Sequence, residues 1–236
     1  FSQSADRETR IYQGVSQEQF SEIWNSRLRF VSRSLGLVQL RGSHHFEPAQ
    51  RSPSDLDWSA SYSVAAREEP DNREVTYLKK DDGLFHFTPK GQSGQRFFAS
   101  NLEHQVAARI DFSQGFRQWQ GLLSAIKVGA AARVRLRDFQ ARRFKFGFGG
   151  IGDIDDTAAP EQIFAPEHLG TAVEVRENTN TADKYNARQG VYAAYGRIDL
   201  PLSSKVSLVG GLRFEAAQHQ ADVGRAAKPS FALIGA

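Results

Sequence analysis

The sequence predicts an all-β chain, an antiparallel transmembrane β-barrel meander of which about seven strands are present. Three observations predict this fold class. Side chains alternate between apolar and polar character at period two, which is typical of strands with one apolar face. No apolar run approaches the roughly 18 residues that a membrane-spanning helix needs. The connections between the predicted strands are alternately long and short, like the loops and turns of membrane barrels.

Composition narrows the classes of function. The 236 residues include 30 basic and 27 acidic ones, and because these are scattered they form no basic stripe for nucleic acid. With no cysteine, the chain has neither disulfides nor thiolate metal sites. Mean hydropathy is -0.49, which suits strands that present alternate residues to lipid and to water. The chain begins at Phe1 and contains no methionine, so we expect a mature or partial segment.

The strands of the first half differ in how cleanly they alternate. A weak strand over residues 5–12 is followed by a second over residues 27–43, whose alternation is imperfect because Leu35 and Leu37 lie among arginines. The third, residues 56–67, alternates best. Its apolar positions are Leu56, Trp58, Ala60, Tyr62, Val64 and Ala66.

The second half contains two further strands and a hairpin. The strands cover residues 101–113 and 121–139, and the hairpin covers residues 185–217. Pro201 lies at the boundary of the first hairpin arm, where a missing backbone N–H is tolerated. The second arm places Val206, Leu208, Gly210, Leu212 and Phe214 on one face and charged Arg213 and Glu215 on the other.

The predicted long connections are the polar stretches over residues 14–26, 67–95 and 141–184, and the short ones lie near residues 48–53, 115–118 and 201–205. Within the long ones, Asp82-Gly83 predicts a small hairpin because this dipeptide tolerates positive φ. Pro160 near the start of residues 160–170 predicts a short helix, with Phe164 and Leu169 covering the loop base. The apolar run over residues 230–236 predicts an interrupted final strand.

Strict alternation of connection lengths favours a membrane barrel, whose periplasmic turns are short and whose extracellular loops are long. It places residues 201–205 at the periplasmic end. The aromatic residues on the apolar positions suit a lipid-facing surface with several aromatics near strand ends, as in an aromatic girdle. They are Trp58, Tyr62, Phe112, Tyr192 and Phe214. A soluble β-domain that packs the same aromatics in a core is the alternative.

Charged residues occupy the opposite positions of the same strands. Burying so many charges in the dry interior of a small barrel would be costly, so they predict a wide barrel with a watery lumen. They are Arg109, Asp111, Arg133, Arg135, Arg137, Asp199, Arg213 and Glu215.

Four segments together resemble the barrel region of TonB-dependent outer-membrane receptors over essentially the whole chain. The most specific is AAYGRIDLPLSSKVSLVGGLRFE, residues 193–215, in which an aromatic strand ends in Asp199-Leu200-Pro201-Leu202 before a tight turn. The others are RLRDFQARRFKF (residues 135–146), REEPDNREVTY (residues 67–77) and RFFASN (residues 96–101).

The resemblance implies a plugged barrel of about 22 strands in the bacterial outer membrane that imports a scarce nutrient such as a ferric siderophore. It implies as partners the membrane lipid and lipopolysaccharide, the rest of the barrel, the plug and the inner-membrane TonB complex. We expect residues 1–236 to be one partial barrel domain, because the sequence shows no plug, no TonB-contacting segment and no aromatic closing strand before Ala236. The alternatives are a non-transporting structural or adhesive barrel component and a soluble ligand-binding β-domain.

The candidate functional residues are lumen-facing charges that contact either a ligand or the plug: Arg109, Arg133, Arg135, Arg137, Arg213 and Glu215. Arg133, Arg135 and Arg137 face one way on a single strand, which would attract an anionic ligand. The alternative is that these arginines pair with carboxylates on neighbouring strands or on the plug.

Other motifs favour structural roles. Residues 147–152 match the G-x-G-x-x-G pattern, but the aspartates at 153, 155 and 156 would repel a phosphate, so we interpret them as a solvated loop. His44 and His45 are adjacent on a strand and point to opposite faces, which disfavours a metal site with Glu47. No catalytic arrangement stands out, so we expect no enzyme, no cofactor and no metal.

Overall fold

A computed structural model describes residues 1–17, 20–47, 52–119, 121–149, 151–203 and 205–224. The chain folds as one antiparallel sheet with the strand order β1-β2-β3-β5-β6-β8-β9, to which β4 adds beside β3 and β7 beside β6. The predicted all-β meander of about seven strands is therefore confirmed for the main path of the sheet. Within the described residues the sheet is open, because β1 and β9 each pair with a single neighbour.

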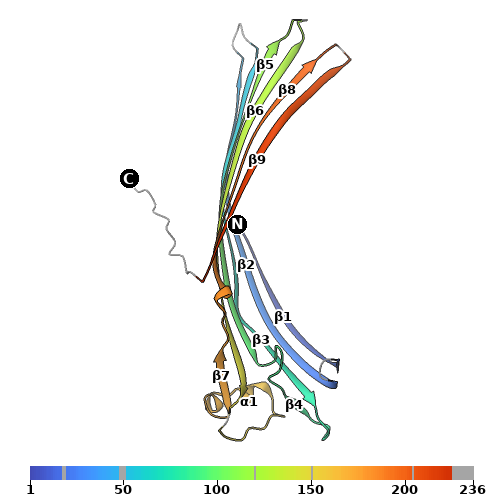
Figure 1. Ribbon diagram of the computed structural model, residues 1–236, viewed down its shortest axis with the longest axis vertical. Coiled ribbons are helices and arrows are strands. Elements are labelled where there is room, and N and C mark those ends of the chain that lie inside the picture. The colour runs from blue at the N-terminus through green and yellow to red at the C-terminus, as the bar shows by residue number, and fades with distance from the viewer. Residues whose placement is uncertain (18–19, 48–51, 120, 150, 204, 225–236) are drawn as a thin grey trace, which may run out of the picture.

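The strands are long and the helices short, as Figure 1 shows. The strands are β1 (Ser2–Ser16), β2 (Ser21–Phe46), β3 (Ser54–Lys79), β4 (Phe85–Phe87), β5 (Gln95–Arg117), β6 (Leu123–Phe148), β7 (Val173–Glu177), β8 (Lys184–Pro201) and β9 (Ser207–Val223). The helical turns are α1 (Pro160–Ile163), η1 (Pro166–His168) and η2 (Thr181–Asp183). Among the described residues, no helix is long and apolar enough to cross a membrane.

Several strands extend far beyond their predicted limits. β2, β3 and β6 have 26 residues each, or about 85 Å at roughly 3.3 Å per residue. The prediction of a polar loop over residues 14–26 was wrong, since most of this stretch belongs to β1 and β2, which are joined by residues 17–20. The first part of the stretch predicted as a loop after Arg67 is likewise strand, up to Lys79. These segments carry polar side chains on both faces, which conceals the alternation that identifies a strand.

The alternation of connection lengths holds for all connections but the first. Short connections, residues 47–53, 118–122 and 202–206, separate strands whose ends lie together at one end of the sheet, shown at the top of Figure 1, which we call the short-turn end. Residues 80–94 and 149–183 form long connections at the opposite end, the long-loop end, where α1, β4 and β7 lie. The first connection, predicted to be long, is short, because β1 ends at Ser16 and β2 begins at its pairing partner Ser21, and these strand ends lie at the long-loop end.

Smaller predictions about the connections are confirmed. Residues 80–84 form a tight turn between β3 and β4, with Gly83 at a φ of +80°. Pro160 begins α1, and Phe164 packs on Phe87 with the ring centroids 5.2 Å apart. Leu169 stays 40% exposed, so it does not cover the loop base as expected. The predicted final strand over residues 230–236 lies outside the described residues.

One face of the sheet, which we call the band face, carries a bare apolar band near the short-turn end. On β6 the apolar band consists of Ile126, Val128, Ala130, Ala132, Val134 and Leu136. The register aligns it with Val38, Leu40, Leu56, Trp58, Tyr62, Val106, Ile110, Phe112, Tyr192, Leu212 and Phe214 on the other strands. These side chains are uncovered: Ile110 is 49% exposed, Tyr192 46% and Leu212 72%.

The predicted aromatic positions thus share one face, but Tyr62, Tyr192 and Phe214 lie within their strands rather than near the ends, because the strands continue past the apolar band. Beyond Leu136 the same face of β6 becomes polar, with Asp138, Gln140 and Arg142.

Near the long-loop end, the band face carries a second apolar cluster, which we call the covered patch: Tyr77, Phe87, Phe146, Ile163 and Val173. Tyr77 pairs with Trp24, which has the same parity as the band residues of β2, and Phe146 has the same parity as those of β6. α1 and β7 cover these strands, so Ile163 is 0% exposed and Val173 1%. This small cluster is the only core among the described residues.

A β-bulge explains how Tyr77 reaches the band face. The register between β3 and β5 shifts between Glu69 and Asn72, so β3 has one extra residue there, next to Pro70. Before the bulge the even residues of β3 lie on the band face, and after it the odd residues do. Val75 and Tyr77 therefore lie on the same face as Leu56 and Tyr62.

Candidate functional site: the polar face

The opposite face of the sheet, the polar face, carries all the candidate residues. Arg135 of β6 lies opposite Gln105, and Arg137 lies opposite Glu103, both on β5. Arg109 and Arg133 follow the same parity on β5 and β6, as Arg213 and Glu215 do on β9. The register therefore confirms that these charges share one face, opposite to the apolar band.

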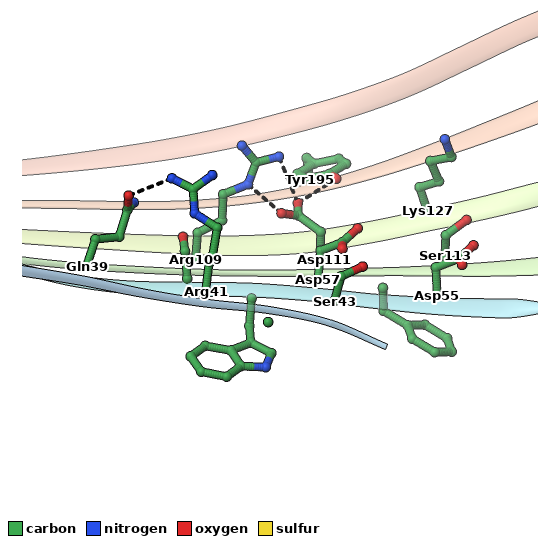
Figure 2. A pocket seen from close by; sticks show the side chains of 14 residues that line it. Gln39, Arg41, Ser43, Asp55, Asp57, Arg109, Asp111, Ser113, Lys127 and Tyr195 are labelled. Atoms are coloured by element: carbon green, nitrogen blue, oxygen red, sulfur yellow. Dashed lines mark hydrogen bonds and ion pairs between the residues drawn. The ribbon is translucent and has the colours of Figure 1, made fainter. Parts of the chain in front are cut away.

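The polar face is hollowed near the short-turn end. A hollow of about 690 Å³ is lined by polar side chains from β2, β3, β5, β6 and β8, as Figure 2 shows. At its centre Arg109 forms a bidentate ion pair with Asp111, in which Nη2 lies 3.2 Å from Oδ1. The hydroxyl of Tyr195 donates to the same Oδ1 at 2.7 Å, so Asp111 is held by two partners.

A glycine makes room for this arrangement. Tyr195 lies across Gly129, where a Cβ would come within 2.3 Å of the tyrosine ring and 2.5 Å of Asp111 Oδ1. Any larger residue at position 129 would displace the tyrosine from the carboxylate.

Arg135 and Arg137 converge on a single carboxylate. Arg137 donates from Nε to Glu103 Oε2 at 2.9 Å and from Nη2 to the same oxygen at 2.5 Å. Arg135 donates from Nη2 to Gln105 at 3.0 Å. Its Nε lies 3.1 Å from Glu103 Oε1, which is an ion-pair distance, but this buried N–H has no hydrogen-bond partner. Glu103 therefore leaves the pair of guanidinium groups with one excess positive charge.

Arg133 differs from its neighbours. Its cross-strand neighbours are Ala107 on β5 and Val191 on β8, neither of which offers a side-chain acceptor. In the part of the chain that the structure describes, no ion pair or hydrogen bond of the Arg133 side chain is found, and the residue is exposed. The alternative that all three arginines pair with carboxylates on neighbouring strands therefore holds for Arg135 and Arg137 but not for Arg133.

Arg109 and Arg213 pair within their own strands rather than across the sheet. Arg109 pairs with Asp111, and Arg213 Nη2 lies 2.8 Å from Glu215 Oε2, in each case two residues along the strand. Residues two apart on a strand share a face, so each pair is neutral and leaves no excess charge for a ligand.

A second hollow lies beside Arg135 and Arg137. It has a volume of about 460 Å³, and its wall also includes Gln189 of β8 and His219 of β9. The small side chains of Ala187 and Ala221, directly opposite Arg137 across β8 and β9, leave this space open. The hollow is therefore bounded on one side by Arg135 and Arg137 and on the other by small and neutral polar residues, with Arg188 of β8 also in its wall.

Toward the long-loop end the charges of the polar face are paired in a network. Glu69 accepts from Arg67 and Asn72 and lies 3.8 Å from Arg29. Glu74 lies 3.9 Å from Arg27, and its Oε1 accepts from the buried amide of Asn25 at 3.1 Å. Each of these acids has several partners, so the network fixes β2 against β3.

The glycine-rich segment after β6 lacks the features of a nucleotide site. β6 ends at Phe148, and the next helix, α1, begins only at Pro160, so no helix N-terminus follows the glycines. A Cβ on Gly149 would lie 2.0 Å from the carbonyl oxygen of Thr171, which shows that this glycine permits close packing of the loop. Gly150 lies outside the described residues.

His44 and His45 lie on opposite faces, as expected of adjacent strand residues. The Trp58 indole donates to His44 at 3.2 Å on the band face, and His45 lies 3.2 Å from Glu47 and 2.5 Å from Asp55. The side chains that the structure describes include no group of three histidines or acids that could hold a metal ion.

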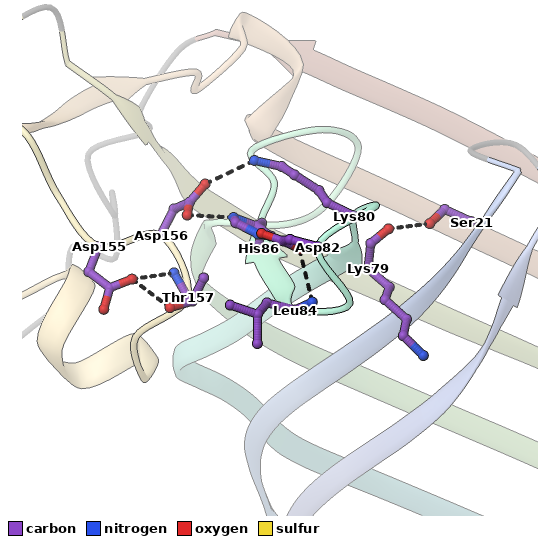
Figure 3. A network of polar contacts seen from close by, with 9 residues as sticks. All are labelled: Ser21, Lys79, Lys80, Asp82, Leu84, His86, Asp155, Asp156 and Thr157. Atoms are coloured by element: carbon purple, nitrogen blue, oxygen red, sulfur yellow. Dashed lines mark hydrogen bonds and ion pairs between the residues drawn. The ribbon is translucent and has the colours of Figure 1, made fainter.

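The aspartates after the glycines hold loops together, as Figure 3 shows. Asp155 accepts from the backbone and hydroxyl of Thr157 at 2.9 and 2.6 Å. Asp156 pairs with His86 of β4 at 2.6 Å, and the other ring nitrogen of His86 lies 2.8 Å from Asp82. Burial opposes the charged imidazole, but the hydrogen bonds to Asp156 and Asp82 outweigh it and raise the pKa of His86.

Sequence reasoning missed several residues of the hollows. Tyr195, Lys127 and Asp57 line the first, and Gln189 and His219 line the second. Parity alone placed them on the polar face, but which of them meet depends on the register between strands, which is not encoded in any single segment.

No family model, no curated protein and no solved structure matches this chain.

Proposed function

We propose that this chain forms part of the wall of an outer-membrane β-barrel of the TonB-dependent transporter class. In this proposal the apolar band faces lipid, the polar face lines a water-filled lumen, and the two edges of the sheet pair with the rest of the barrel. The whole transporter imports a scarce nutrient such as a ferric siderophore, with energy from the inner-membrane TonB complex.

The observation that carries the proposal is the height of the apolar band. Positions 126 to 136 of β6 cover about 34 Å along the strand, or about 24 Å of membrane thickness at a tilt of about 45°. Apolar surfaces of membrane barrels are about 25 Å tall. A soluble protein seldom leaves so wide an apolar surface uncovered, because contact with water disfavours it. The limited height of the apolar band and the absence of protein covering it among the described residues therefore both support a lipid-facing surface.

The positions of the connections support one orientation. The apolar band adjoins the short-turn end, and the strands continue well beyond it toward the long-loop end. Membrane barrels have short turns at the periplasmic side and long loops outside the cell. We therefore assign the turn at residues 202–206 to the periplasm and α1 to the extracellular side.

Single-cysteine labelling tests the lipid-facing assignment, and the absence of native cysteine makes each label unambiguous. Leu212→Cys lies in the apolar band, Leu208→Cys lies on the band face at the edge of the apolar band toward the short-turn end, and Arg213→Cys lies on the polar face of the same strand. In lipid vesicles we expect the first two to react only with a lipid-soluble probe and the third with an aqueous reagent.

Asp222→Cys is the matched control, because it shares the strand and the face of Leu212 but lies in register with Asp138 of β6, beyond the apolar band. It should react with the aqueous reagent. Equal aqueous labelling at all four positions would contradict the membrane assignment and favour a soluble β-domain.

Uptake measurements on the complete gene product test the transport part of the proposal. A plug domain upstream and iron uptake that depends on the TonB complex are expected. Membrane insertion without such uptake would leave a structural or adhesive barrel component instead.

A further inference from the structure

We infer that Arg133, Arg135 and Arg137 form a binding site for small anions with two or more negative charges, such as polycarboxylates. The site is the 460 Å³ hollow on the polar face between β6, β8 and β9, which Arg135 and Arg137 line and beside which Arg133 lies two residues along β6. The claim that this site selects the substrates of the barrel rests on the proposed function. The claim that the site binds anions depends only on the residues of the polar face.

The charges of the hollow do not cancel. The three arginines of β6 contribute three positive charges, and Glu103 pairs with Arg135 and Arg137 but not with Arg133, so two positive charges remain. Unlike Arg109 and Arg213, which have acidic partners of their own, Arg133 has no acceptor among the described residues. An excess of two charges beside an open space favours a multivalent anion over a monovalent one.

Not every N–H group of these arginines has a hydrogen-bond acceptor. The buried Nε of Arg135 has no hydrogen-bond partner, although Nη2 of the same group donates to Gln105. A carboxylate that entered the hollow would offer acceptors to such unsatisfied donors, and arginine binds carboxylates through two parallel hydrogen bonds.

The opposite wall suits an oxygen-rich ligand. Gln189 lies directly opposite Arg135, and His219 lies opposite Gln189. An amide and an imidazole both donate hydrogen bonds without adding a negative charge. Ala187 and Ala221 keep the space next to Arg137 free of larger side chains.

Glu103 acts as an internal competitor in this site. It occupies Arg137 and lies within ion-pair distance of Arg135, so an entering carboxylate must share these arginines with it. The removal of its charge should therefore strengthen anion binding, an effect opposite to that of removing an arginine.

Calorimetric titration of the full chain in detergent, at physiological ionic strength, tests the inference with citrate, inorganic phosphate and acetate as probes. We expect citrate to bind more tightly than phosphate, and acetate more weakly than both. Arg133→Gln should weaken citrate binding roughly threefold to tenfold, and Glu103→Gln should strengthen it by a similar factor. Added salt should weaken binding in every variant that binds.

Lys127→Gln is the matched control, because Lys127 is a second cation without a partner among the described residues and lies on the same face of β6. It is about 20 Å from Arg133 along the strand, which exceeds the screening length at physiological salt. Its citrate affinity should stay that of the unchanged protein.

Absence of citrate binding, or equal weakening by Arg133→Gln and Lys127→Gln, would overturn the inference. The first result would mean that these arginines bind no small anion, and the second would indicate an unspecific effect of net charge. Because Arg133 has no partner to lose, its replacement should not disturb folding. The cysteine-labelling result is independent, so failure of the membrane assignment would not be mistaken for failure of anion binding.

Discussion

The apolar band and the covered patch lie on the same face of the same strands, yet one is bare and the other buried. Phe214 in the apolar band is 73% exposed, whereas Phe87 in the covered patch is 3% exposed. The chain uses a loop with α1 and β7 to cover the patch at the long-loop end. It provides no such cover over the apolar band among the described residues.

In the proposed barrel, the difference reflects two surroundings for one face. Where strands extend into water, apolar side chains must be covered by protein, because their exposure costs about 25 cal/mol per Å². Where they lie in lipid, no cover is needed, and a sheet can remain a single layer. Polar residues separate the two zones on β6, among them Asp138 and Gln140. The predictions below test this contrast, from the largest expected effect to the smallest.

Phe87→Ala should destabilise the covered patch most. Phe87 makes edge-to-face contacts with Tyr77, Phe148 and Phe164, and the loss of a buried phenylalanine costs about 3–5 kcal/mol. We expect the loop over residues 151–183 to open locally, which hydrogen exchange of its backbone amides would measure.

Phe214→Ala is the matched control for that experiment, since it removes the same side chain from the apolar band. It should leave the exchange rates of the loop unchanged. If both variants accelerate exchange equally, the two zones are not independent.

Ile110→Arg should reveal the surroundings of the apolar band. Ile110 lies opposite Ala130, near the middle of the apolar band, where an arginine in lipid costs about 2–4 kcal/mol. In water the same change at a half-exposed position should cost no more than about 0.5 kcal/mol. Denaturant unfolding in lipid vesicles measures the difference.

Gln140→Arg provides the comparison, because it lies on the band face but beyond the apolar band. Its unfolding free energy should remain within about 0.5 kcal/mol of that of the unchanged protein. A cost for Ile110→Arg as small as this would exclude lipid contact at the apolar band.

The attachment of the loop over the covered patch should weaken as pH rises. His86 joins Asp82 in the β3–β4 turn to Asp156 in the long connection, with Asp155 and Lys80 nearby. Its folded-state pKa is raised above the ordinary value of 6.5, so the charged imidazole stabilises this contact fully below about pH 6.5. The contribution is lost as the pH rises through the raised pKa.

Limited proteolysis of residues 151–183 across this pH range measures the effect, which should be severalfold at most. His86→Gln should remove the pH dependence between neutral and mildly alkaline conditions. A pH dependence that survives in this variant would assign it to another group.

The sequence predicted which side chains share a face of the sheet much better than it predicted where the strands begin and end. Alternation was clear wherever one face is apolar, as in residues 56–67, and it placed Trp58 and Arg133 on opposite faces correctly. It failed beyond the apolar band, where both faces are polar and a strand resembles a loop. The bulge near Pro70 compounds this, because the apolar positions change from even to odd there.

The sequence predicted which charged residues share the polar face, but not which of their side chains are in contact. Arg135 and Arg137 were identified because charged residues occupy alternate positions of β6. That both contact Glu103 follows only from the register between β5 and β6. The same holds for Tyr195, which reaches Asp111 across Gly129 of the strand between them. Contacts between strands are set by the turns and bulges that fix the register, and these are long-range properties.

The bulge between Glu69 and Asn72 also makes the two parts of β3 unequal in their tolerance of insertions and deletions. Removal of one residue there would turn Val75 and Tyr77 to the polar face and bring Glu74 and Thr76 under the loop. The apolar band would keep its side chains in place, because its part of β3 is fixed by the register with β2 and β5. Related chains that vary in length at this point should therefore vary in the loop that covers the patch, while their apolar bands stay alike.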